Sequence, residues 1–255
     1  MRVPLADVGR RGRMELTFAQ QDGRTILRDA YCEVPFKVTR LLAHAPVAHL
    51  ILMHSTAGLF GGDELECSIR VEKGARVRIT QQSATKIHPS EDRIAVQRTK
   101  VFVEHGAQLQ LYLEPIIPFA DSRLRQETQL NVEPGGRLSY WEAFMTGRVG
   151  RGEAWQFREL ASETKLVCGG RLVYLDRFRL VPGNPRRSTW TMGNSGYTGL
   201  GLHVGEDARV RAADLHQALP EAGIDALADN ITVARIVCLS GPDFHHGREV
   251  FCQSP

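Results

Sequence analysis

Apolar and polar side chains alternate in many short stretches of the first 180 residues. Strict alternation is typical of a β-strand with one buried face, because successive side chains point to opposite sides of a sheet. The run 47–53 is apolar almost throughout, which indicates a strand covered on both faces. The alternating runs predict strands over residues 14–19, 25–27, 34–42, 94–103, 154–160, 164–168 and 171–180.

One phrase occurs three times among these strands, at residues 71–77, 103–109 and 132–138. Each copy begins with Val-Glu, turns at a glycine and continues as a second alternating run, and the copies lie about 30 residues apart. A period of that length is typical of stacked repeats, which bury their apolar faces against the next copy. We interpret each copy as a β-hairpin. The pattern predicts an all-β fold of stacked hairpins in two layered sheets, similar to a β-helix, with a small C-terminal helical portion.

The helical portion is predicted after residue 205. Residues 206–219 place alanine and leucine on one helical face and are followed by Pro220, whereas 221–228 suggest a second short helix. The glycine-rich stretch 197–204 lacks the Gly-Lys-Ser or Gly-Lys-Thr ending of a phosphate-binding loop, so we expect a strand there, and another at 231–239. We therefore predict one domain over residues 1–255, with 206–229 as a helical insertion or cap.

Composition excludes several classes of protein. The 255 residues are 42% hydrophobic and 24% charged, and the net charge of +3 is spread along the chain, which gives little support to nucleic-acid binding. Five cysteines without a C-x-x-C pair suit reduced thiols in the cytosol better than a disulfide framework. No apolar run is long enough to cross a bilayer, and Met1–Asp7 show no signal-peptide core. We expect a cytoplasmic protein without a nucleic-acid or membrane partner.

Two polar stretches near the first repeat are candidates for function. The loop 55–63 ends in Gly61-Gly62-Asp63, and it is either a recognition loop with a positioned carboxylate or a plain tight turn. The run 79–87 is rich in amide and hydroxyl side chains, which are costly to bury without hydrogen bonds. These side chains are therefore solvated, bonded to one another, or lining a wet channel.

Two further candidates lie in later strands. Pro115 and Pro118 lack an amide hydrogen and must interrupt the ladder beside Glu114, where the alternative to a functional break is a sheet corner with a buried aromatic ring. Glu142 falls inside an apolar, aromatic strand. Because an unpaired buried charge is too costly, Glu142 either points outward or is buried with a partner such as Arg148.

The C-terminal histidines suggest a metal site only weakly. His245, His246 and Cys252 offer imidazole and thiolate ligands that suit nickel, on a stretch that we expect to be a flexible tail. Adjacent histidines need further ligands to hold one ion, so a specific site here is the less favoured interpretation. No H-E-x-x-H, G-x-S-x-G or Walker motif occurs.

Several short motifs follow one another along the chain. They are Gly61-Gly62-Asp63, the run Thr80-Gln81-Gln82-Ser83-Ala84-Thr85-Lys86, Glu114-Pro115, Ile117-Pro118-Phe119, Glu142, Gly147-Arg148, Gly152-Glu153 and Asp176-Arg177. Taken together in order and spacing, these motifs resemble the urease accessory protein UreD family, called UreH in some organisms. The likeness runs from about Gly12 to Leu180 and continues more weakly to Leu239, with a departure in the loop 54–58.

The resemblance implies an assembly factor without catalytic activity. It would bind UreF, the GTPase UreG and apo-urease, and help to deliver nickel to the urease active site, with no tightly bound cofactor. Transient nickel contacts are implied for Asp63, Glu142 and Glu153, because oxygen ligands hold nickel less tightly than imidazole or thiolate does. The implied partner or channel residues are Asp63, Gln81, Thr85, Lys86, Glu114, Glu142, Arg148, Glu153, Asp176 and Arg177. The implied structural residues are Gly61, Gly62, Pro118, Phe119, Gly147 and Gly152.

An enzyme is the alternative hypothesis. A hydrolase or lyase on a β-helical frame would use two of Asp63, Glu114 and Glu142 as a carboxylate pair. Such a pair must lie within a few ångströms in an open cleft, so the positions of these three carboxylates discriminate between the two hypotheses.

Overall fold

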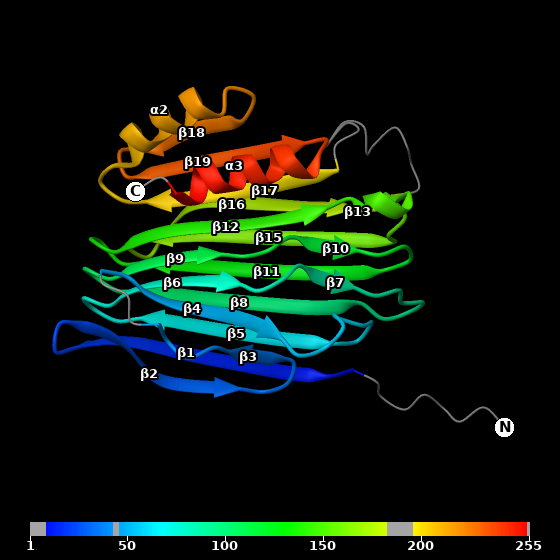
Figure 1. Cartoon of the computed structure of the whole chain (residues 1–255), viewed down its shortest axis with the longest axis horizontal. Helices are drawn as coiled ribbons and strands as arrows, with labels where there is room; N and C mark the ends of the chain where they lie inside the picture. Colours follow the sequence, from blue (N-terminus) through cyan, green and yellow to red (C-terminus); the bar gives the residue numbers. More distant parts are fainter. Residues whose placement is uncertain (1–8, 43–45, 183–195, 254–255) are drawn as a thin grey trace.

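Two β-sheets pack face to face in the computed structural model, which describes residues 9–42, 46–182 and 196–253 (Figure 1). The predicted absence of a signal-peptide core concerns Met1–Asp7, which lie outside these residues. The first sheet has seven strands, in the spatial order β16 (Arg171–Leu180), β15 (Glu159–Cys168), β11 (Arg123–Val132), β8 (Ala95–Val103), β5 (Glu64–Val71), β1 (Arg11–Gln21) and β2 (Arg24–Cys32).

The second sheet has ten strands. Its main order is β18 (Gly223–Ala228), β19 (Ile231–Cys238), β17 (Tyr197–Val204), β12 (Arg137–Met145), β9 (Gln108–Tyr112), β6 (Arg76–Gln81), β4 (Ala48–His54) and β3 (Phe36–Val38). Beside this path lie β10 (Ile116–Pro118), which pairs with β12 and β7, and β7 (Thr85–Ile87). A separate small pair consists of β13 (Gly147–Arg148) and β14 (Glu153–Ala154), joined through the 3₁₀ turn η1 (Val149–Arg151). In the described part of the chain the α-helices are α2 (Ala208–Ala218) and α3 (Gly241–Gln253).

The repeated phrase forms the turns between the sheets. Gly74, Gly106 and Gly135 have positive φ and connect β5 to β6, β8 to β9 and β11 to β12, each time from the first sheet to the second. Within each sheet the successive repeats pair in parallel, as in a β-helix. The predicted all-β fold in two stacked layers is confirmed, but each repeat is an arch between sheets and not a hydrogen-bonded hairpin. An arch and a hairpin show the same alternation of apolar and polar residues, so the sequence pattern alone did not distinguish them.

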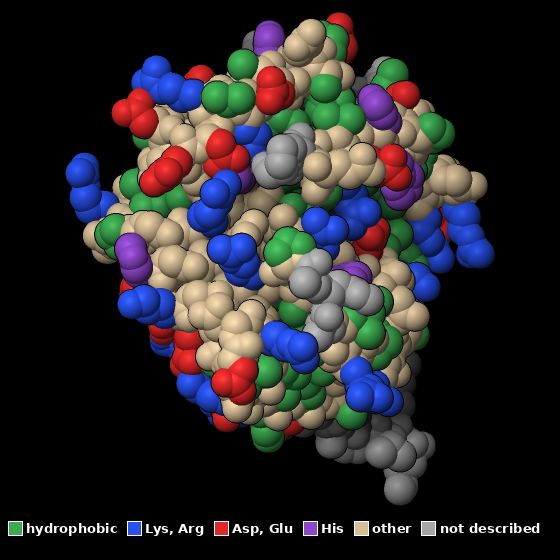
Figure 2. All heavy atoms as spheres, turned by 60° about the vertical axis from the view of Figure 1, so that its left-hand side comes forward, with side chains coloured by type: hydrophobic (Ala, Val, Ile, Leu, Met, Phe, Trp, Pro, Cys, Tyr) green, Lys and Arg blue, Asp and Glu red, His purple; other side chains and the backbone are tan. Residues whose placement is uncertain are grey.

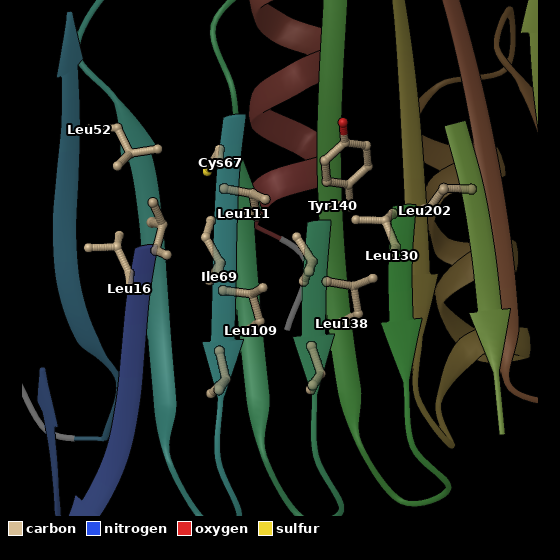
Figure 3. Packing of buried hydrophobic residues seen from close by; sticks show 14 of the residues in the cluster. Leu16, Leu52, Cys67, Ile69, Leu109, Leu111, Leu130, Leu138, Tyr140 and Leu202 are labelled. Carbon is tan, nitrogen blue, oxygen red and sulfur yellow. The ribbon is translucent and has the colours of Figure 1, made fainter. Parts of the chain in front are cut away.

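The core lies between the two sheets. Leu16, Ile69 and Leu130 project from the first sheet toward Leu109 and Leu138 of the second, and each is at most 1% exposed (Figure 3). Full burial of such a side chain contributes roughly 1.5–3 kcal/mol. Stacking of the arches is therefore what stabilises the fold, since a single arch leaves its inner face exposed.

A second, smaller core forms where the helices cover the second sheet. Trp141, Phe244 and Phe251 pack together there, so α3 is a docked helix and the prediction of a flexible tail at His245-His246 is wrong. Residues 221–228 are also not a helix, because Gly223–Ala228 pair antiparallel with β19 as strand β18. The free edge of β19 offers backbone partners to this short segment, which is too short to be a stable helix by itself. No helix among the described residues is long and apolar enough to cross a membrane.

A polar seam between the sheets and an aromatic rim

Part of the space between the sheets is polar. Parallel pairing aligns Thr99, Thr128 and Thr164 across β8, β11 and β15, and Asp176 of β16 completes this row at the edge of the sheet. The next row aligns Gln97, Gln126 and Ser162. Both rows occupy the inward positions of strands whose other inward residues are apolar.

Glu142 enters this polar region from the second sheet. It lies two residues after Tyr140 on β12 and therefore shares the inward face. Its carboxylate accepts hydrogen bonds from Gln126 Nε2 (2.7 Å), from the hydroxyl of Tyr140 (2.9 Å) and from the hydroxyl of Thr164. Burial raises the pKa of Glu142, and the nearby charge of Asp176 acts in the same direction, while the hydrogen bonds from Thr164 and Tyr140 oppose the shift. The site thus holds a carboxylate that is well hydrogen-bonded but poorly solvated.

An ion pair closes the edge of this region. Arg235 Nη2 of β19 lies 2.7 Å from Asp176 Oδ2, which links the two sheets, and the two side chains are 32% and 21% exposed. A cavity of about 20 Å³ lies between this ion pair and Glu142, bordered also by Gln126 and Ser162. That volume holds roughly one water molecule. We call this set of residues the polar seam: Gln97, Thr99, Gln126, Thr128, Tyr140, Glu142, Ser162, Thr164, Asp176 and Arg235.

The chemistry of the polar seam suits weak contact with a hard cation. Its ligand atoms are carboxylate, amide and hydroxyl oxygens, which bind divalent metals less tightly than imidazole or thiolate does. No group of three or more histidine, cysteine or acidic side chains that could hold a metal occurs among the described residues. At the C-terminus, burial raises the pKa of Cys252 to about 12, which disfavours the thiolate form that binds metals. His245 packs edge-on against Phe244.

Asp63 lies outside the polar seam, in the turn before β5. Its carboxylate accepts hydrogen bonds from the backbone amides of Arg10 and Phe60, both at 2.9 Å, and the residue is only 4% exposed. Asp63 therefore fixes the loop that contains Gly61 and Gly62.

Three predicted residues, Phe119, Arg148 and Glu153, lie together with Phe60 and His88, which were not predicted as site residues, and we call these five residues the aromatic rim. Phe60 stacks on His88 with ring centroids 4.3 Å apart, and His88 meets Phe119 edge-on at 5.0 Å. The guanidinium of Arg148 lies 4.0 Å from the centre of the Phe119 ring. The rim thus brings together loops from several successive layers of the stack.

Arg148 is held over Phe119 by Glu153. Its Nε donates to Glu153 Oε2 at 2.6 Å, and this hydrogen bond lowers the pKa of Glu153. Of the two alternatives predicted for Glu142, burial with partners is therefore correct, but Arg148, the example given, is not one of them. Gly147 permits the close pairing of β13 with β14, since its φ is +141° and a Cβ there would lie 2.1 Å from the carbonyl oxygen of Glu153.

The polar run near the first repeat is bonded internally. Gln81 Nε2 donates to Thr85 Oγ1 at 2.8 Å, and Gln81 Oε1 accepts from the amide of Glu114 at 3.2 Å. Lys86 next to Thr85 is exposed. Hydrogen bonding within the run therefore satisfies Gln81 and Thr85, as one of the three alternatives predicted. The strand pattern does break at Pro115, since β9 ends at Tyr112 and β10 begins at Ile116.

The remaining candidates have separate partners. Glu114 Oε1 lies 2.7 Å from Arg248 Nη2 of α3, and Arg177 pairs with Glu163 on the outer face of the first sheet. Asp63, Glu114 and Glu142 thus contact three different sets of groups, with no shared partner among the described residues. This geometry does not support the carboxylate pair that the enzyme hypothesis requires.

The sequence interpretation missed most of the seam. Only Glu142 and Asp176 were predicted as site residues, and the missed ones are Gln97, Thr99, Gln126, Thr128, Tyr140, Ser162, Thr164 and Arg235. A signal was present, because Gln-x-Thr-x-Val at 97–101, Gln-x-Thr-x-Leu at 126–130 and Ser-x-Thr-x-Leu at 162–166 repeat two polar inward positions before an apolar one. Aligning the repeats by strand, instead of by turn, reveals this pattern.

Comparison with known proteins gives a consistent result. The family model described as UreD urease accessory protein matches residues 10–253. The chain is 33% identical over 249 residues to the urease accessory protein UreD of Deinococcus radiodurans, covering 96% of this chain and 89% of that protein. It is 35% identical over 176 residues to UreD of Acetivibrio thermocellus, covering 68% and 67%. It is also 30% identical over 161 residues to the urease accessory protein UreH of Helicobacter hepaticus, covering 63% and 64%.

Proposed function

Because the chain belongs to the UreD family of urease accessory proteins, we propose that it acts as a scaffold and metallochaperone in the insertion of nickel into apo-urease. It works without catalysing a reaction, in the cytoplasm, in a complex with UreF and UreG. The observation that carries this proposal is the polar seam, which places Glu142 and the Asp176–Arg235 pair in an otherwise apolar core.

In this proposal the polar seam supplies oxygen ligands along a route for a divalent cation. Asp176 is reached first, since part of its side chain is exposed to solvent, and the ion pair with Arg235 must open for the cation to replace the guanidinium. Glu142 lies deeper, beside a cavity that holds about one water. An approaching cation favours ionised Glu142, so it opposes the effect of burial on the pKa of this carboxyl. A small number of oxygen ligands binds the ion weakly and so releases it again, which is what a transfer protein requires.

Partner proteins dock at the aromatic rim in this proposal. Phe60 is 39% exposed, and the cation–π contact and ion pair of Arg148 keep the rim in one arrangement. A rigid aromatic and arginine surface is typical of the residues that contribute most to protein interfaces. Asp63 supports this surface because it fixes the backbone at Phe60.

Two variants test the proposal in different ways. We expect the wild-type chain to co-purify with UreF, UreG and apo-urease and to support urease activation. Glu142→Ala should retain the partners and lose activation, whereas Asp63→Ala should weaken co-purification because the loop at Phe60 loses two hydrogen bonds. Glu127→Ala, on the outer face of the first sheet, is the control and should behave as wild type. Full activation in the absence of the chain, or co-purification with none of these partners, would refute the proposal.

A further inference from the structure

The outer face of the second sheet is only partly covered by helices. Helix α3 contacts β12, β17 and β19, and α2 contacts β18 and β19. Tyr112 of β9 is buried in one apolar cluster with Phe244 and Phe251 of α3, whereas none of the main helix contacts among the described residues reaches β6 or β4. Two strands at about 4.8 Å spacing span about 10 Å, and a helix with its side chains is about 10–12 Å wide. The bare area thus has the width of one more helix beside α3.

Arginines dominate this bare face. Arg76 and Arg78 of β6 point outward and are exposed, and Arg78 Nε donates to Gln110 Oε1 of β9 at 2.6 Å. Neither arginine has a carboxylate partner in the part of the chain that the structure describes. Figure 2, which brings the left-hand end of the stack in Figure 1 forward, shows Lys and Arg side chains among acidic and apolar ones on that side of the molecule.

Two carboxylates beside the helices that border this face are already paired. Asp207 Oδ1 lies 3.0 Å from Arg137 Nη2, and Glu114 Oε1 lies 2.7 Å from Arg248 Nη2. The positive charge of Arg76 and Arg78 is therefore not balanced locally. An incoming surface that balances it must be acidic.

Apolar surface accompanies the charge. Ile51 and Met53 of β4 are half-buried on the outer side of the sheet, in rows that also contain Thr80 of β6 and Lys37 of β3. Arginines beside apolar side chains fit an amphipathic segment that has both an apolar and an acidic side.

We propose that the bare face formed by β4 and β6 docks an acidic amphipathic helix of a partner protein, alongside α3. The occupant is a helix because the site is the face of a sheet, where the backbone groups are already paired, and not a free edge that would bind a strand. It is not a second copy of this chain, since a two-fold contact through this face would bring Arg76 and Arg78 against their own counterparts. The proposal concerns a surface separate from the polar seam and does not depend on ion transfer.

A binding assay with a defined probe tests this inference. The probe is a fluorescein-labelled helical peptide of about 20 residues, or roughly five turns, with glutamate on one face and leucine on the other. A matched peptide carries glutamine in place of glutamate. Fluorescence anisotropy should show that the wild-type protein binds the glutamate peptide, that binding weakens as salt rises, and that the glutamine peptide binds at least about tenfold more weakly.

Charge reversal locates the site. Arg76→Glu combined with Arg78→Glu should weaken binding of the glutamate peptide by at least about tenfold, or about 1.4 kcal/mol. The control combines Lys100→Glu with Arg125→Glu, two exposed residues on the outer face of the first sheet, and makes the same change in net charge. This control should bind within about twofold of wild type. Circular dichroism confirms that both variants fold.

Three results would overturn the proposal. One is equal affinity of the two double variants for the glutamate peptide, and another is no binding of this peptide by the wild-type protein. The third is tighter binding of a single-stranded thymidine oligonucleotide that is lost in the Arg76/Arg78 variant, which would assign the face to nucleic acid. Urease activation is not part of this assay, so its result is independent of the nickel proposal.

Discussion

Two neighbouring rows of the same sheet differ in what they do for the protein. One row consists of Leu16, Ile69, Val101, Leu130 and Leu166, and it is sealed against the opposite sheet. The other consists of Cys67, Thr99, Thr128 and Thr164, each two residues earlier on the same strand, and of Asp176 on the neighbouring strand β16. Backbone, twist and pairing are shared, so the side chains alone decide whether the space between the sheets is closed or polar. The apolar row stabilises the fold, whereas the polar row stabilises it less but forms a polar site between the sheets.

Truncation of the apolar row should have the largest effect on stability. Leu130 is fully buried, so Leu130→Ala leaves a cavity and should lower the free energy of unfolding by about 3 kcal/mol. Thr128→Val in the polar row removes only a hydroxyl and should change it by about 1 kcal/mol or less. Urea unfolding measures both. Equal losses in the two variants would show that the rows do not differ as described.

Breaking the ion pair at the end of the polar row should have an intermediate effect. Asp176→Ala leaves Arg235 without its anion and should cost about 2 kcal/mol, less than for a fully buried pair because both side chains are partly exposed. The combined variant Asp176→Asn with Arg235→Gln removes both charges and should cost clearly less than Asp176→Ala. A combined loss as large as that of Asp176→Ala would mean that the charges themselves stabilise the fold.

Removing the charge of Glu142 should have the smallest effect on stability, and the effect should depend on pH. Because burial raises the pKa of Glu142, the folded state binds this proton more tightly than the unfolded state, and ionisation of Glu142 opposes folding. That cost is absent well below the ordinary pKa of 4.5 and is complete above the raised value. Glu142→Gln should therefore raise the free energy of unfolding at pH 7 by up to about 1 kcal/mol.

Thermal unfolding of Glu142→Gln and wild type across this pH range is the measurement. The advantage of the variant should shrink as the pH falls toward 4.5, where wild-type Glu142 also becomes neutral. An advantage that is the same at every pH would show that the charge of Glu142 is not its source.

The comparison also explains what the sequence could predict. Alternation and the Val-Glu-x-Gly repeat correctly predicted layered β-strands, because a strand with one buried face has alternating apolar and polar residues. The repeat did not reveal that its turns join opposite sheets, since the strands of arches and of hairpins show the same alternation. Thr128 and Gln126 were missed because a polar residue between apolar ones normally faces solvent. Only the pairing of strands about 30 residues apart shows that they face inward.

The most direct test of the role of the polar seam is nickel transfer by a variant whose seam has no negatively charged side chain. The variant combines Glu142→Gln with Asp176→Asn, which keeps the shapes of both side chains, and its control combines Glu66→Gln with Glu127→Gln on the outer face. Each complex is purified with the urease partners, supplied with nickel, and assayed for nickel bound to urease. We predict normal assembly for both and at least about tenfold less nickel in urease with the seam variant, while the control matches wild type. Full nickel loading by the seam variant would contradict the account, because the apolar and polar rows would then differ in composition without differing in function.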